Sequence, residues 1–240
     1  MGGKKVIKEA IILAGGQGTR LRSVVSDVPK PMAPIGNRPF LSYLLKYLSK
    51  QGLQRIYLST GYKSQLVETI GNEAYGMKLA FVPEEQPLGT GGAIEHTLKH
   101  VNGSDVFVVN GDTYFDVDLG GMENRHLQSG AEITMAVKQM ERFNRYGSVR
   151  MVRERVVSFE DKAYRETGLI NGGVYIMQTK VFGKLQFSLN PPFSFEKDVL
   201  ERYVDTALDI HGYLSTGYFI DIGIPEDYAK AIKELPEKFT

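Results

Sequence analysis

The chain reads AIILAGGQGTRL over residues 10–21. Its first four residues form a short, continuous apolar run, which is typical of a buried strand. Gly15, Gly16 and Gly18 follow after Ala14, and glycine lets a backbone turn sharply and bring its N–H groups close to an anion. Ligands of open α/β sheets bind beyond the carboxyl ends of the strands. The stretch therefore predicts an α/β fold with an anion site at the end of its first strand.

Outward from this stretch, short apolar runs alternate with helical spacing. We expect further strands at residues 55–59, 78–82 and 106–109, and helices at residues 39–53, 64–70 and 92–99. Repeated strand–helix–strand units with continuous apolar strands imply a mostly parallel sheet that helices cover on both faces.

The pattern changes after about residue 115, where apolar and polar residues alternate. This alternation is typical of antiparallel or edge strands, which we expect at residues 131–137, 148–152 and around 156–157. We also expect strands at residues 173–177 and 218–223, and helices at residues 195–203 and 226–235. The predicted fold is thus a Rossmann-like, mostly parallel central sheet flanked by helices, with a smaller antiparallel sheet. We expect a single domain over residues 1–240, with a nucleotide-binding half at about 8–115 and a second half at about 116–240 that completes the site.

Two side chains add donors to the glycine loop. The guanidinium of Arg20 is a planar fork that suits phosphate oxygens, and Thr19 contributes a hydroxyl. A dinucleotide fingerprint would need glycine where Leu21 stands, and a Walker A motif would need a Gly-Lys-Ser/Thr that does not follow. The loop is therefore a phosphate loop of another kind, or a plain turn between a strand and a helix.

Lys30 stands between Pro29 and Pro31. Two prolines hold this segment extended, so the ammonium group would be presented to a ligand with little conformational loss. Taken alone, Lys30 could equally be a solvated loop lysine.

Composition excludes several classes of protein. Of 240 residues, 42% are hydrophobic and 24% are charged, which fits a globular protein and not a disordered one. The formal net charge of +1 lacks the basic surplus of a nucleic-acid binder. The absence of cysteine excludes disulfides, Cys-ligated zinc and thiol nucleophiles. No apolar run reaches the roughly 18 residues of a membrane helix, and the amino terminus lacks a signal-peptide pattern. We expect a cytoplasmic protein that binds neither nucleic acid nor membrane.

Residues 13–21, taken together with Pro29-Lys30-Pro31, resemble the sugar-1-phosphate nucleotidylyltransferase family. Ser23 and Val24 stand where members often have Pro and Leu. The resemblance extends over nearly the whole chain and implies the nucleotide-diphospho-sugar transferase type of fold. It also implies that the nucleotide is bound by loop residues Leu13, Gly15, Gly16, Gly18, Thr19 and Arg20.

A second matching segment runs QPLGTGGA over residues 86–93. By resemblance, Gln86 and Gly91 contact the nucleobase and its ribose. A loop that leads into a helix would have the same spacing, so the segment is informative only together with the first one.

Asp112 and Asp221 each follow a predicted strand. Asp221 is a lone charge between Ile220 and Ile222, which is costly to bury unless the charge is paired or bound to a metal. In the family that the chain resembles, the two aspartates hold one Mg²⁺ beside the α-phosphate of the nucleotide, and Asp112 also contacts that nucleotide. Two carboxylates with phosphates and water suit Mg²⁺. A strand-end residue or a helix N-cap is the alternative for Asp221.

The sugar-phosphate side rests on weaker matches. Residues 159–162, Phe-Glu-Asp-Lys, are similar to a family Phe-x-Glu-Lys pattern, in which Lys162 binds the sugar phosphate. Asp161 stands where Glu is usual and is one methylene shorter. The resemblance also places Tyr146-Gly147 and Asn171-Gly172 in the sugar pocket, although a plain turn would explain each pair alone.

The resemblance implies an enzyme that converts an NTP and a sugar 1-phosphate to an NDP-sugar and pyrophosphate by Mg²⁺-assisted in-line attack. Arg20, Lys30, Asp112 and Lys162 form the expected catalytic set. The chain is most similar to short bacterial guanylyltransferases that act on D-glycero-α-D-manno-heptose 1-phosphate, so we expect GTP and that sugar phosphate as substrates. Related mannose-1-phosphate guanylyl- and glucose-1-phosphate uridylyl- or thymidylyltransferases are the alternatives.

Two hypotheses come from other classes of protein. One is a non-catalytic subunit that binds a nucleotide-sugar, and such a subunit would usually have lost one of the four residues Arg20, Lys30, Asp112 and Asp221, which are all present. The other is an RNA-modifying nucleotidyltransferase, for which the chain lacks a basic surplus. Relatives commonly associate, which favours a homodimer.

Overall fold

The computed structural model describes residues 6–16, 21, 25, 28–185 and 191–239. Within them, ten strands form one mixed sheet. Their spatial order is β10 (Ser148–Val152), β11 (Arg155–Glu160), β13 (Ile210–Ser215), β9 (Ile133–Phe143), β12 (Arg165–Gln178), β7 (Asp105–Asn110), β1 (Glu9–Leu13), β4 (Arg55–Thr60), β6 (Met77–Pro83) and β5 (Glu73–Ala74).

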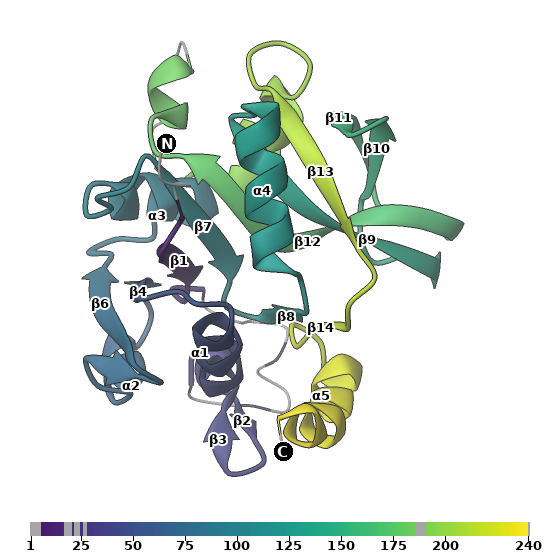
Figure 1. Cartoon of the computed structure of the whole chain (residues 1–240). Helices are drawn as coiled ribbons and strands as arrows, with labels where there is room; N and C mark the ends of the chain where they lie inside the picture. The colour runs from purple at the N-terminus through teal and green to yellow at the C-terminus, as the bar shows by residue number, and fades with distance from the viewer. Residues whose placement is uncertain (1–5, 17–20, 22–24, 26–27, 186–190, 240) are drawn as a thin grey trace.

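The predicted parallel half consists of β7, β1, β4 and β6, which run parallel to one another. Ala10, Ile11 and Ile12 of β1 have no solvent exposure, because the strand lies in the middle of this half and helices cover both of its faces (Figure 1). Ile12 packs into one hydrophobic cluster and Ile11 into another. A continuous apolar run is what such a doubly covered strand requires.

The antiparallel strands of the second half continue this same sheet. β12 is antiparallel to both β7 and β9, while β13 is parallel to β9. β10 pairs with β11 and also with β12, so that β10, β11, β13, β9 and β12 close into a ring. Two small antiparallel sheets complete the fold, β14 (Phe219–Asp221) with β8 (Thr113–Phe115), and β2 (Pro34–Ile35) with β3 (Arg38–Pro39). The expected α/β fold class is confirmed, with the antiparallel strands joined to the central sheet.

The helices divide between the two faces of the sheet. α1 (Phe40–Lys50), α2 (Ser64–Glu68), α4 (Leu119–Ser129) and α5 (Pro225–Lys238) contribute to the cluster around Ile12. α3 (Gly89–Leu98) and the wide helix η3 (Phe195–Glu201) contribute to the cluster around Ile11. Short 3₁₀ turns are η1 (Lys30–Met32) and η2 (Val181–Lys184). The sequence patterns did not predict α4 or β13.

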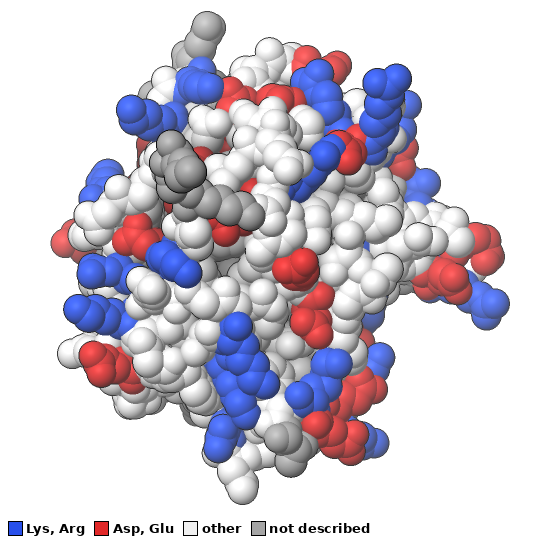
Figure 2. All heavy atoms as spheres, in the orientation of Figure 1, with Lys and Arg blue, Asp and Glu red and all other residues white. Residues whose placement is uncertain are grey.

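No helix in the described part of the chain is long and apolar enough to cross a membrane. Basic and acidic side chains are intermixed over the face of the molecule drawn in Figure 2, in keeping with the net charge of +1.

Candidate functional site

A polar cavity of about 380 Å³, here called the carboxylate cavity, lies at the end of β7 beside the small β14–β8 sheet. It gathers residues from six separate stretches of the chain. They are Lys30, Asn110, Asp112, Thr113, Tyr146, Asn171, Gly172, Gly173, Glu196, Phe219, Asp221, Gly223 and Ile224. Six of these had predicted roles, and the structure brings them together: Lys30, Asp112, Tyr146, Asn171, Gly172 and Asp221.

Two backbone contacts position Asp112. The N–H of Gly111 donates to the carbonyl of Leu13 at 3.0 Å, which ties the end of β7 to the end of β1. A Cβ at Gly111 would lie 2.3 Å from that same carbonyl oxygen, so this close approach requires glycine. The N–H of Ile222 donates to the carbonyl of Asp112 at 2.9 Å and brings the segment that carries Asp221 alongside.

Lys30 and Asp112 form an ion pair inside the cavity. The Nζ of Lys30 lies 2.6 Å from Oδ2 of Asp112, and the two side chains are 22% and 30% exposed. Pro29 is extended, but Lys30 itself begins the short 3₁₀ turn η1, so the prediction that Lys30 lies in an extended segment is wrong.

Asp221 is the most perturbed carboxyl group of the cavity. Burial and then the negative charge of Asp112 raise its pKa to about 6, against the opposing effects of the Gly223 N–H and of Lys30. The Gly223 N–H donates to its Oδ1 at 2.7 Å. A cation bound in the cavity would favour the ionised form of Asp221.

These residues fit Mg²⁺ bound together with a phosphate. Among the residues that the structure describes, no group of three or more acidic, His or Cys side chains could enclose a metal ion. Asp112 and Asp221 offer two carboxylates in one cavity. Mg²⁺ is commonly held by one or two carboxylates with substrate phosphates and water, so the pair meets its needs without an all-protein cage.

A second cavity, of about 530 Å³, lies over the glycine loop and is here called the glycine-loop cavity. Its lining includes the predicted residues Leu13, Gly15, Gly16 and Gln86, with Ser59, Gly61, Tyr62, Glu84, Glu85, Pro87, Gly89, Thr90 and Ala93. Gly15 packs closely, because a Cβ there would lie 2.9 Å from Oε1 of Glu84 and 3.2 Å from the nitrogen of Gly61.

The two cavities adjoin at the ends of paired strands. Leu13, the last residue of β1, lines the glycine-loop cavity and is the register partner of Asn110, the last residue of β7, which lines the carboxylate cavity. Gly18, Thr19 and Arg20 lie outside the described residues.

Gly91 lies away from the glycine-loop cavity, under Phe193. It is buried, its N–H donates to the carbonyl of Phe193 at 3.0 Å, and a Cβ on it would lie 2.3 Å from the Phe193 ring. Gly89 and Thr90, the two preceding residues, line the cavity in its place. The expected contact between Gly91 and the nucleotide stays a prediction.

The predicted sugar-side residues divide into two groups. Asn171 and Gly172 line the carboxylate cavity at a bulge of β12, where Asn171 donates to the Tyr175 hydroxyl at 2.6 Å and accepts from the Gly173 N–H at 3.0 Å. Asp161 and Lys162 are exposed residues that follow the end of β11, and they do not line this cavity.

Gly147 also lies outside the lining of the carboxylate cavity, whereas its neighbour Tyr146 belongs to it. A Cβ at Gly147 would lie 2.7 Å from the carbonyl oxygen of Glu160, so this glycine serves the pairing of β10 with β11. Burial, and then the charge of Asp221, raise the pKa of Tyr146, which keeps its hydroxyl protonated.

Sequence reasoning missed Asn110 and Glu196. The Oδ1 atom of Asn110 is buried and has no hydrogen-bond partner among the described residues, so it is an acceptor available to a ligand in the cavity. Glu196 lies in η3, within the helix predicted over residues 195–203, but no sequence signal placed this helix at the cavity.

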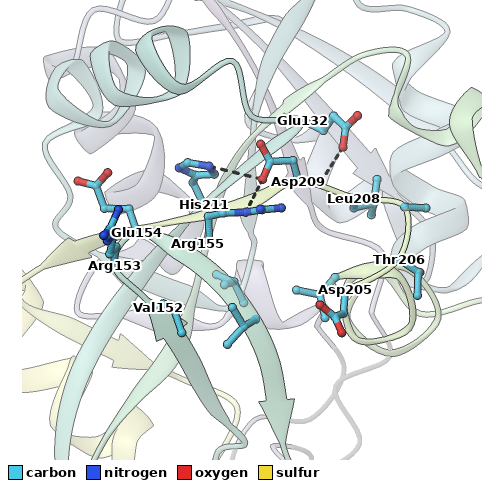
Figure 3. A pocket seen from close by; sticks show the side chains of 14 residues that line it. Glu132, Val152, Arg153, Glu154, Arg155, Asp205, Thr206, Leu208, Asp209 and His211 are labelled. Carbon is cyan, nitrogen blue, oxygen red and sulfur yellow. Dashed lines mark hydrogen bonds and ion pairs between the residues drawn. The ribbon is translucent and has the colours of Figure 1, made fainter.

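A third cavity, of about 850 Å³, lies at the far edge of the sheet between β10–β11 and β13 (Figure 3). Arg155, Asp209 and His211 of its lining pair with each other. Asp209 lies 3.0 Å from Nε of Arg155 and 3.5 Å from His211, and its N–H donates to Glu132 at 2.7 Å. This cavity contains none of the residues with predicted roles.

Comparisons with known proteins agree with this geometry. The chain is 50% identical to a D-glycero-alpha-D-manno-heptose 1-phosphate guanylyltransferase of Aneurinibacillus thermoaerophilus, over 95% of this chain and 98% of that protein. It is 44% identical to the Campylobacter jejuni protein of the same name, over 92% and 96% of the two chains. The structure of HddC from Yersinia pseudotuberculosis complexed with GMP-PN superposes with a TM-score of 0.83 at 38% identity, covering 98% of this chain and 100% of that one.

The model of the nucleotidyl transferase family matches residues 9–238, a span that includes β1, both adjoining cavities and α5. The chain belongs to the nucleotidyl transferase family.

Proposed function

We propose that the chain transfers the guanylyl group of GTP to D-glycero-α-D-manno-heptose 1-phosphate and releases pyrophosphate. The observation that carries the proposal is the pair of adjoining cavities at the ends of β1 and β7, with Lys30, Asp112 and Asp221 in the second. The choice of substrates is supported by the two relatives at 50% and 44% identity, which match over nearly their full lengths.

In this proposal the nucleotide occupies the glycine-loop cavity and directs its α-phosphate toward the carboxylate cavity. A phosphate monoester is already a nucleophile near neutral pH, so the reaction needs positioning and charge neutralisation more than a general base. A phosphate oxygen of the sugar phosphate attacks the α-phosphorus in line, and pyrophosphate leaves on the opposite side. Lys30 neutralises charge that develops at the phosphorus centre. Arg20 and Lys162 are proposed to bind the leaving pyrophosphate and the sugar phosphate.

Asp112 and Asp221 would hold Mg²⁺, which supplies charge neutralisation between the two anionic substrates. The ion pair of Lys30 with Asp112 keeps this carboxylate in the cavity before substrates bind.

The sugar would be bound by polar side chains at the carboxylate cavity. Asn110, Tyr146 and Glu196 line it and can accept or donate hydrogen bonds to hydroxyl groups. A heptose offers more hydroxyl groups than a hexose, and a cavity lined by such side chains suits a polyhydroxylated ligand.

The test is a pyrophosphate-release assay with Mg²⁺ that crosses the four common NTPs and dTTP with three sugar phosphates. These are the α-1-phosphates of D-glycero-D-manno-heptose, mannose and glucose. Release only with GTP and the heptose phosphate is the expected result. Release with another pair would retain the reaction and refute the proposed substrates, and no release with any pair would refute the proposed catalysis.

A further inference from the structure

The first turn of α3 and the start of η3 are joined through one hydroxyl group. The Oγ1 of Thr90 donates to Oε2 of Glu196 at 2.8 Å and accepts from the N–H of Phe195, also at 2.8 Å. Both hydrogen-bonding functions of this hydroxyl are therefore directed to η3, although Thr90 and Glu196 are 106 residues apart.

The two residues line different cavities. Thr90 lines the glycine-loop cavity, and Glu196 lines the carboxylate cavity with Lys30, Asp112 and Asp221. The hydrogen bond between them is a direct connection between the proposed nucleotide site and the proposed sugar-phosphate site.

The backbones around this connection pack too closely to shift independently. A Cβ on Gly89 would lie 2.4 Å from the carbonyl oxygen of Phe193, and one on Gly91 would lie 2.3 Å from the Phe193 ring. The N–H of Phe193 donates to the carbonyl of Leu88 at 3.0 Å. A ligand that fixes the first turn of α3 therefore also fixes the segment that carries Glu196.

The carboxylate of Glu196 is oriented by hydrogen bonds to one of its two oxygen atoms. Among the described residues, the hydrogen bonds to it come from Thr90 and, at 3.1 Å, from Ser194, and both reach Oε2. This arrangement leaves Oε1 as an acceptor for a hydroxyl group in the cavity. Hydrogen bonds to charged groups are stronger than those between neutral groups, and the contact from Thr90, at 2.8 Å, is the shorter of the two, so its loss would free the carboxylate to reorient.

We propose that Thr90 is a positioning residue that couples the binding of the nucleotide to the binding of the sugar phosphate. The inference rests on the proposed function. A nucleotide that packs on the first turn of α3 orders Thr90 and, through it, Glu196, so the sugar phosphate binds a carboxylate that is already oriented. Thermodynamic linkage makes the effect reciprocal, with each ligand raising the affinity for the other by the same factor.

The experiment measures this factor by calorimetry on the whole chain with Mg²⁺. The ligands are the heptose phosphate and a GTP analogue with a methylene group between the α- and β-phosphorus atoms, which cannot transfer its guanylyl group. The factor is the ratio of the Kd for one ligand without and with the other. We expect at least about fivefold for the wild type. Thr90→Val keeps the shape of the side chain but removes the hydroxyl. It should reduce the factor about tenfold, or to unity where the wild-type factor is smaller than that.

Two control variants separate coupling from structural damage. Thr90→Ser retains the hydroxyl and should restore the factor. Ser194→Ala removes the other donor to Oε2 of Glu196 together with the cap of η3. Because Ser194 is not on α3, the coupling factor should persist in this variant even if the affinity for the ligands falls. Should Thr90→Val not fold, Glu196→Ala supplies a second test, because it removes the acceptor of the Thr90 hydroxyl. The factor is a ratio within one variant, so it should fall there whatever happens to affinity.

An unchanged factor in a folded Thr90→Val protein would overturn the inference, and so would a wild-type factor of one. Either result could accompany full guanylyl transfer, in which case the proposed function would stand. Absence of guanylyl transfer by the wild type would instead overturn the proposed function, and the coupling with it.

Discussion

Replacing Lys30 with methionine separates the contribution of its charge to turnover from its contribution to the stability of the fold. The ion pair of Lys30 with Asp112 is partly open to solvent, with side chains 22% and 30% exposed. Such pairs contribute about 0–1 kcal/mol to stability. For a chain of this length, a loss of 1 kcal/mol lowers Tm by about 2–4 °C, so Lys30→Met should remain folded at assay temperature.

The same substitution should have a much larger effect on turnover. Lys30 lines the carboxylate cavity, where charge develops during transfer of the guanylyl group. Loss of one preorganised donor to a developing charge lowers kcat by about 10²–10³. We expect this loss in the pyrophosphate-release assay, with Tm followed in parallel by thermal unfolding.

Lys46→Met is the matched control. The Nζ of Lys46 donates to the carbonyl of Phe239 at 2.7 Å, and Lys46 lines neither of the two cavities of the proposed site. It should lose a similar amount of stability and keep its kcat. A kcat of Lys30→Met within tenfold of the wild type would refute the catalytic assignment, and a protein that does not fold would refute the stability argument.

Three further outcomes test the site and the fold. Asp221→Asn should raise the Mg²⁺ concentration needed for half-maximal activity, and chelation of Mg²⁺ should abolish wild-type turnover. An Asp221→Asn protein with the Mg²⁺ dependence of the wild type would exclude Asp221 as a ligand. Gly173 has φ +71°, and a Cβ on it would lie 2.8 Å from Nδ2 of Asn110, so Gly173→Ala should lower the free energy of unfolding in urea by about 2 kcal/mol or more. Gly183→Ala, with no atom within 4 Å of the added Cβ, is its control, and equal stability of the two would contradict this argument. Burial raises the pKa of Glu9, but hydrogen bonds from Tyr57, Gly103 and Asn102 outweigh it and hold the pKa below the ordinary 4.5. The ionised carboxylate of Glu9 therefore stabilises the fold above pH 4.5, and this effect is lost as pH falls through the lowered pKa. Glu9→Gln should be less stable than the wild type at neutral pH and should match it at a pH well below the lowered pKa, where both side chains are neutral. A stability difference that persists at low pH would show that the ionised carboxylate is not its cause.

The sequence by itself determined the parallel half of the fold and the centre of the site. Each buried strand there is a local, continuous apolar run, and β1 and β7 each lead directly into a segment that carries glycine and a functional side chain. Because parallel strands end at one edge of a sheet, local signals such as residues 13–16 and Asp112 were sufficient to place ligand-binding residues together. Resemblance to a family added Asp221 and Gln86, which line the two cavities.

Elements with weak local signals depended on tertiary structure. α4 has two glycines in its first turn and only three buried residues, and β13 mixes His, Gly and Tyr with its apolar residues. Both are stabilised by packing against partners distant in sequence. β13 fills its place beside β9, and its mixed composition reflects exposure of part of the strand.

Tertiary structure alone decided which residues share a cavity. Gly91 is covered by Phe193, Lys162 lies exposed beyond β11, and Glu196 meets Thr90 across 106 residues of chain. Spacing along a sequence reports which residues share a helix or a strand, because those periods are local. It does not report the path by which η3 returns to α3, and that path determines whether the two proposed binding sites are joined by a hydrogen bond.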